Sequence, residues 1–135
     1  MRLTTPLTNV DSSALYALGS RVQDKSGNEY IYLKGVGSTL AGSWVTYDED
    51  GTTTLLVADA KGPVAVAMAI IDATTEYGWY QIWGEATALL SANCADNGLL
   101  GRETTNGYAG DGKATGDQLM GALAREATVA AGEAT

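Results

Sequence analysis

The chain has 135 residues, enough for one domain with a core and too few for two ordinary ones. Hydrophobic residues make up 45% and charged residues 18%, a globular composition, and 17 glycines favour many tight turns and a β-rich fold. The net charge of -8 repels phosphate backbones and anionic membrane surfaces, which argues against nucleic acid and membranes as direct partners.

Residues 1–17 are polar and aperiodic and contain Pro6, a pattern typical of an extended N-terminal arm that docks on a neighbour. They lack the long apolar run of a signal peptide, so we expect the chain to be made in the cytoplasm. Residues 18–128 are expected to form a single β domain. The alanine-rich residues 129–135 are expected to be a flexible tail.

Two hairpins are predicted after the arm. In the first, Ser20 to Asp24 and Glu29 to Gly35 flank a short polar turn, and alternation predicts that Ile31 and Leu33 face the core. In the second, a turn rich in carboxylates joins two further β-prone runs. These runs are Ser43 to Tyr47 and Thr52 to Ala58.

Val64 to Ile71 is apolar on both faces, which predicts a central strand. In the next run, Gly78 to Ala86, Tyr80 and Ile82 alternate with a face that mixes aromatic and polar side chains, a composition suited to a contact surface. That face carries Trp79, Gln81 and Trp83. Closure of the core edge by the two tryptophans is the alternative.

Two more short strands are expected, at Thr87 to Ala92 and at Leu99 to Glu103, followed by a glycine-rich loop over residues 104–116. Residues 116–128 fit either a helix or a strand. Gly121 favours a strand, because glycine costs a helix about 1 kcal/mol relative to alanine. The chain is therefore predicted to be all-β, a compact barrel or sandwich of short antiparallel strands.

Sites for chemistry are few in this sequence. It contains no histidine, which removes the commonest general base and most transition-metal sites, and no enzymatic activity, cofactor or metal is expected. The carboxylates of Asp48 to Asp50 resemble the middle of a calcium loop, but Thr46 and Val57 stand at its two end positions. Gly107 to Ala114 follows the spacing of a phosphate loop until Ala114, which cannot bind magnesium. Cys94 is expected to be a small buried hydrophobe.

The aromatic residues are seven tyrosines and three tryptophans, with no phenylalanine. Tyrosine and tryptophan tolerate half-buried positions at contact surfaces because each carries a polar group, so this set favours an interaction protein. Stacking of exposed tryptophan or tyrosine on a sugar is the alternative, and would make the chain a carbohydrate-binding β-sandwich module.

Residues 20–85 resemble the capsid decoration, or cement, proteins of tailed bacteriophages in the order of four short blocks. The blocks are Glu29 to Gly35, Ala41 to Asp48, Gly62 to Ala67 and Glu76 to Gly84, of which the last two are the most specific. They cover roughly half of the chain well.

The resemblance implies a compact β fold on the outer surface of the virion capsid, where it bridges and stabilises the lattice of the major capsid protein. It also implies a homo-oligomer, with a trimer favoured. The arm and the aromatic face are the candidate partner interface. This interface comprises Leu3, Pro6, Leu7, Trp79, Gln81 and Trp83.

Overall fold

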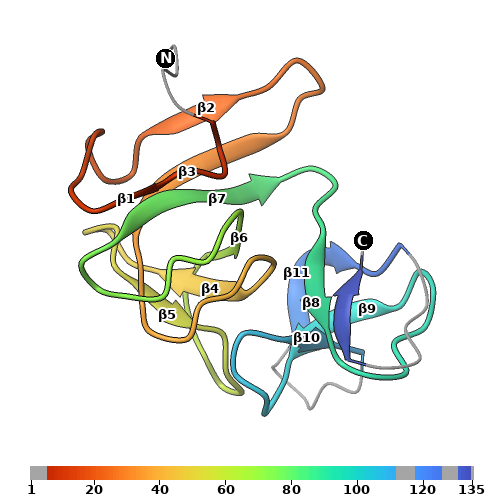
Figure 1. The fold of residues 1–135 in the computed structure, drawn as a ribbon. Helices are drawn as coiled ribbons and strands as arrows, with labels where there is room; N and C mark the ends of the chain where they lie inside the picture. The colour runs from red at the N-terminus through yellow and green to blue at the C-terminus, as the bar shows by residue number, and fades with distance from the viewer. Residues whose placement is uncertain (1–5, 112–117, 126–130, 135) are drawn as a thin grey trace.

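The computed structural model describes residues 6–111, 118–125 and 131–134. All regular structure in these ranges is β, in twelve strands that form two sheets (Figure 1). The all-β fold is confirmed. The two sheets pack in a sandwich-like arrangement, not as a closed barrel.

The first sheet uses residues 10–83 and has the strand order β2-β3-β7-β6-β4-β5. β1 pairs with the start of β7, on the edge of β7 that β6 occupies further along. All of these pairs are antiparallel. The strands are β1 (Val10–Asp11), β2 (Arg21–Gln23), β3 (Glu29–Lys34), β4 (Trp44–Tyr47), β5 (Thr53–Leu55), β6 (Val64–Ala67) and β7 (Tyr77–Trp83).

The second sheet uses the C-terminal part of the chain and has the order β11-β9-β10-β8-β12. Its pairs are antiparallel except β8 with β10, which run parallel. The strands are β8 (Ala88–Leu90), β9 (Leu99–Arg102), β10 (Ala109–Gly110), β11 (Gln118–Leu123) and β12 (Gly132–Ala134).

Both predicted hairpins are present, and an aspartate stabilises each turn. Asp24 accepts hydrogen bonds from the backbone N–H groups of Ser26 and Asn28 in the β2–β3 turn. Asp48 does the same for Asp50 and Thr52 in the β4–β5 turn. Such side-chain bonds to a neighbouring backbone are the reason aspartate is common in turns.

The first sheet is buried on both faces. Ile31 and Leu33 face one core cluster, as predicted, together with Tyr80 and Ile71. The opposite face of the same strands carries a second cluster, formed by Tyr30, Tyr32 and Trp79. A sheet at the surface of a protein is usually buried on one face only. Because the tyrosines of β3 are buried on the second face, another segment of the chain must cover that face.

That layer is residues 6–17, which we call the N-terminal strap. Leu7 and Tyr16 of the strap pack against the aromatic cluster, where the ring centroids of Tyr16 and Trp79 lie 5.5 Å apart. The hydroxyl of Tyr32 donates to Asp11 at 2.6 Å and accepts from the N–H of Leu15 at 3.2 Å. The described part of the predicted arm therefore lies on the chain's own sheet.

Several boundaries differ from the sequence prediction. β6 ends at Ala67, four residues earlier than expected, and β10 lies inside the expected loop. The tail was predicted to be flexible, but residues 132–134 form β12 and pair with β8. Residues 118–123 form a strand, as favoured, and Gly121 has a φ of +78° within its irregular register. Positive φ is a conformation that glycine adopts at low cost.

A third core cluster joins the two sheets. Leu90, Leu100 and Leu119 of the second sheet share it with Leu56, which follows β5, and Trp44 of β4 packs against it. The buried thiol Cys94 belongs to the same cluster, which confirms the prediction for the cysteine. The indole N–H of Trp44 donates to the carbonyl of Leu89 at 3.1 Å. The sheets are thus connected by both apolar packing and hydrogen bonds.

Candidate interaction site

The structure separates the six predicted interface residues. Trp83 is 68% exposed and Pro6 is exposed, whereas Leu7, itself part of the strap, is half-buried against the aromatic cluster. Leu3 lies outside the described residues. Trp79 and Gln81 are 1% and 6% exposed, so the prediction that their side chains form a contact surface is wrong.

The reason for this error is the strap. Trp79 does lie on the face opposite Tyr80, as alternation along β7 requires. Tyr16 and Leu7 of the strap cover the face that carries Trp79. The sequence of the strap has no regular period, so its packing on the sheet was not predicted. Closure of the core, the alternative for both tryptophans, holds for Trp79 alone.

Gln81 has a structural role that fixes the exposed tryptophan beside it. Its Nε2 donates to the backbone carbonyls of Trp83 at 3.1 Å and of Glu85 at 3.0 Å. Gly84, with a φ of +101°, turns the chain directly after Trp83. A side chain at Gly84 would collide with Asn28 of the β2–β3 turn. The backbone around Trp83 is therefore held from two sides.

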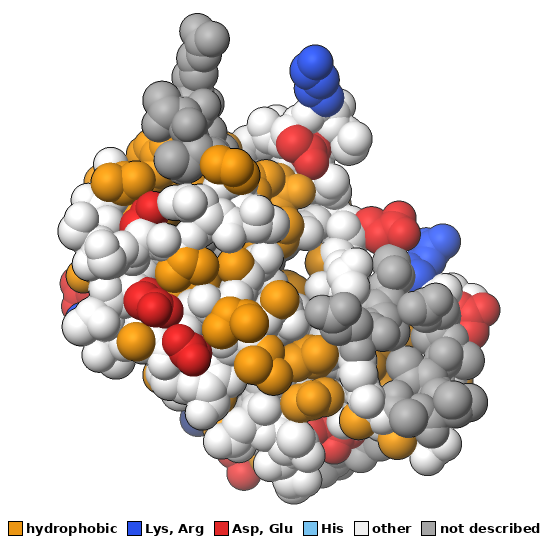
Figure 2. Space-filling view, viewed as in Figure 1, with side chains coloured by type: hydrophobic (Ala, Val, Ile, Leu, Met, Phe, Trp, Pro, Cys, Tyr) orange, Lys and Arg blue, Asp and Glu red, His pale blue; other side chains and the backbone are white. Residues whose placement is uncertain are grey.

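An apolar groove of about 470 Å³ opens between the two sheets beside Trp83. The pairing of β6 with β7 ends at Val66 and Gln81, and the groove begins beyond this last pair. Figure 2 shows hydrophobic side chains gathered around this hollow. The apolar side chains that line it include Trp44, Val64, Val66, Ile82, Leu90 and Leu123.

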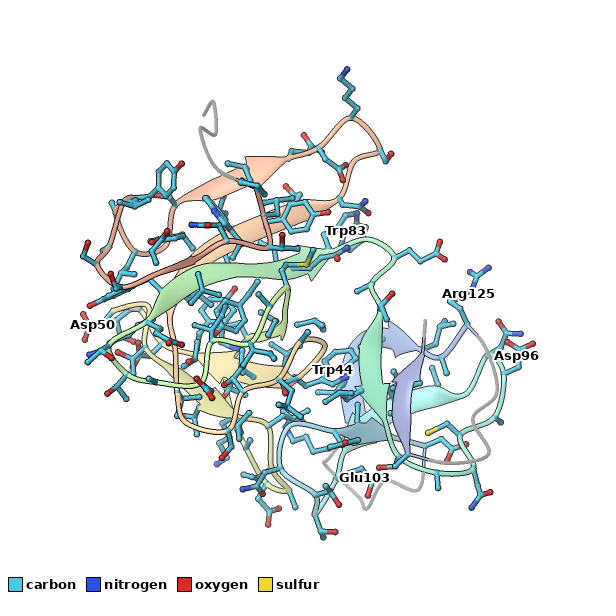
Figure 3. All side chains as sticks on the ribbon, in the orientation of Figure 1. Trp44, Asp50, Trp83, Asp96, Glu103 and Arg125 are labelled. Carbon is cyan, nitrogen blue, oxygen red and sulfur yellow. The ribbon has the colours of Figure 1, made fainter. Side chains whose placement is uncertain are left out.

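The two rims of the groove come from different sheets. On one rim Trp83 ends β7 and Glu85 follows it, and on the other Leu123 ends β11 and Arg125 follows it. Figure 3 shows Trp83 beside the end of β7, Arg125 on the far side of β8, and Trp44 below them. Leu123 is 42% exposed. The β7 rim thus carries the exposed Trp83 and the negative charge of Glu85. The β11 rim carries the exposed Leu123 and the positive charge of Arg125.

Sequence reasoning missed Leu123 and Arg125. A regular strand would put Leu119, Gly121 and Leu123 on one face, but Leu119 is 2% exposed and Leu123 is 42% exposed. The register shift within β11 changes which residues face the core. Gly121 was the only available signal for that shift.

The strap carries a second set of exposed apolar side chains. Leu15 is 55% exposed, Leu18 just beyond the strap is 37% exposed, and Val10 is 36% exposed. The N–H of Leu15 is bonded to Tyr32 in the aromatic cluster, so the exposed side chain stands on a fixed backbone. None of the three was predicted, because the segment has no regular period.

The carboxylates of Asp48 to Asp50, which resemble the middle of a calcium loop, belong to the β4–β5 turn. Asp48 is committed to its own turn, and Figure 3 shows Asp50 and Glu103 at distant points of the molecule. No cluster of three potential metal ligands occurs in the described ranges. The last residues of the glycine-rich Gly107 to Ala114 motif lie outside the described ranges. Its first residue, Gly107, has a structural role, because its backbone is hydrogen-bonded to the backbones of Trp44 and Leu56 and so links the sheets.

Electrostatic perturbation is strongest at tyrosines and not at acids. Burial raises the pKa of Tyr32 well above its usual range, and the hydrogen bond to Asp11 adds to this shift. Burial also raises the pKa of Tyr80 to about 12. The side-chain amide of Asn28 lowers the pKa of Asp24 in the β2–β3 turn. These shifts accompany structural hydrogen bonds and core positions.

Comparison of the chain with family models, with curated proteins and with solved structures found no match. Among the residues described, no helix is long and apolar enough to cross a membrane.

Proposed function

We propose that this chain is a virion structural protein that binds the outer surface of a bacteriophage capsid and stabilises the lattice of the major capsid protein. The observation that carries the proposal is the order of the four sequence blocks that resemble decoration proteins. These blocks contain β3, β4, β6 and β7, the four inner strands of the first sheet. The likeness thus covers a framework on which contact surfaces are placed.

The strap is the surface that we assign to the capsid. Leu15 and Leu18 expose apolar area to water, and burying such area is worth about 25 cal/mol per Å². A small rigid protein that buries apolar surface across two coat subunits stabilises the assembled lattice, because it binds the assembled form better than the separate subunits. We retain the expectation that the N-terminal arm contacts the capsid. The contact surface is the outer side of the strap, whose inner side packs on the first sheet.

The first experiment mixes purified protein with undecorated heads and measures occupancy by imaging. Leu15→Asp is expected to lower the affinity for heads by about tenfold or more, since a charge would enter an apolar contact. Ile70→Asp is a matched control, because Ile70 is also 55% exposed and lies outside the strap. Both variants should retain the wild-type circular dichroism spectrum.

Absence of ordered density on heads saturated with wild-type protein would overturn the proposal. Equal binding by Leu15→Asp and wild type would overturn the assignment to the strap. Carbohydrate binding has weaker support, because Trp79 is buried and the indole N–H of Trp44 is bonded to Leu89, which leaves Trp83 as the one widely exposed tryptophan. A glycan array that is positive for wild type and blank for Trp83→Ala would favour that alternative.

A further inference from the structure

We propose that the groove between the sheets is the interface of a two-fold symmetric dimer of this chain. The first argument is that the groove exposes apolar side chains that the chain itself leaves uncovered. Trp83 is 68% exposed and Leu123 is 42% exposed, and both stand beside a hollow of about 470 Å³ lined by valine, leucine and tryptophan. Large exposed apolar patches of this kind mark interaction sites.

The second argument is that the two rims complement each other. One rim carries Trp83 and Glu85, and the other carries Leu123 and Arg125. A two-fold axis running along the groove places each rim against the opposite rim of the second copy. Trp83 then meets Leu123 of the other copy, and Glu85 meets its Arg125. Each of these contacts forms twice, as an isologous interface requires.

The third argument is electrostatic. The chain carries a net charge of -8, which opposes association of two copies unless the contact surface itself is balanced. The groove is balanced, because Glu85 and Arg125 are the two charged side chains among the residues that line it. Opposite charges across an interface also fix its register.

The symmetry that this surface supports is two-fold, whereas a trimer was favoured from the family resemblance. A cyclic trimer joins two different surfaces of each copy, head to tail. Here the exposed apolar side chains and both charges belong to one surface. A dimer therefore uses every feature of the groove, and a trimer would leave half of them unpaired.

The experiment measures the mass of the purified full chain by sedimentation equilibrium from micromolar to millimolar concentration. Wild type is expected to be a dimer, and Trp83→Ala should weaken association by about thirtyfold or more, the typical effect for a central interface tryptophan. Leu40→Ala is the control, because Leu40 is 48% exposed and does not line the groove. It should dimerise like wild type.

Charge reversal tests the pairing directly. Arg125→Glu and Glu85→Arg should each weaken the dimer, and the double variant should restore it, because the pair is formed again with its signs exchanged. A monomer or a trimer at the highest concentration would overturn the proposal, as would a dimer unaffected by Trp83→Ala or a double variant without rescue. No heads are present in this experiment, so its failure and the failure of capsid binding are separate results.

Discussion

Two tyrosine hydroxyls on opposite faces of the first sheet meet different surroundings. The hydroxyl of Tyr32 bridges Asp11 and the N–H of Leu15, so it joins the strap to the sheet. The hydroxyl of Tyr80 is buried without a hydrogen-bond partner in the described structure, although Thr53 lies near enough to lower its pKa slightly. A buried hydroxyl without a partner destabilises the folded state, while the ring around it contributes packing.

Tyr80→Phe should therefore keep or slightly raise stability at neutral pH and change its dependence on alkaline pH. Burial raises the pKa of Tyr80 from 10.0 to about 12, so above pH 10 the unfolded chain releases this proton first. The free energy of unfolding of wild type then falls as pH rises, and Tyr80 contributes about 2 kcal/mol of that loss by pH 12. Urea denaturation from pH 8 to pH 12 should show a smaller loss in the variant; equal losses in both proteins would contradict the burial argument.

At the scale of elements, regular strands were predictable and their covering layer was not. Alternation along β3 and β7 identified which residues share a face, and a polar segment and a carboxylate-rich segment located the two hairpin turns. The strap has only a two-residue strand and is held by side chains such as Asp11 and Tyr16, which come together only in three dimensions. For that reason the burial of Trp79 could not be predicted from the sequence. The groove could not be predicted either, because its rims, at Trp83 and Leu123, are forty residues apart along the chain.

The hydrogen bond between Asp11 and Tyr32 should control whether the strap stays docked. Asp11→Ala removes the acceptor at 2.6 Å and leaves the buried Tyr32 hydroxyl without it, at a cost of about 1–3 kcal/mol. Hydrogen exchange should accelerate in residues 9–17 more than in β4. Asp111→Ala is the control, since it removes only an exposed hydrogen bond from the N–H of Ala95, beside the second sheet. Uniform acceleration over the whole chain would show that the strap is not a separate unit.

At the scale of the whole molecule, the second sheet depends on the first for part of its core. Leu56 comes from the end of the first sheet but packs with Leu90, Leu100 and Leu119 of the second. The backbone of Gly107 is also bonded to Trp44 and to Leu56, at 2.9 Å each. Two sheets that share a cluster and these bonds are expected to unfold together, as one domain.

Leu56→Ala tests whether the sheets form one cooperative unit. Leu56 is 0% exposed, and truncating a buried leucine costs about 2–5 kcal/mol. Tryptophan fluorescence reports mainly on the first sheet, which carries all three tryptophans, and far-ultraviolet circular dichroism reports on both sheets. The two urea curves should coincide in wild type and shift together in the variant. Leu99→Ala, at a side chain 48% exposed in β9, should shift them far less. If fluorescence and circular dichroism separate in Leu56→Ala, the shared cluster is a contact between two independently stable sheets, and the single-domain interpretation fails.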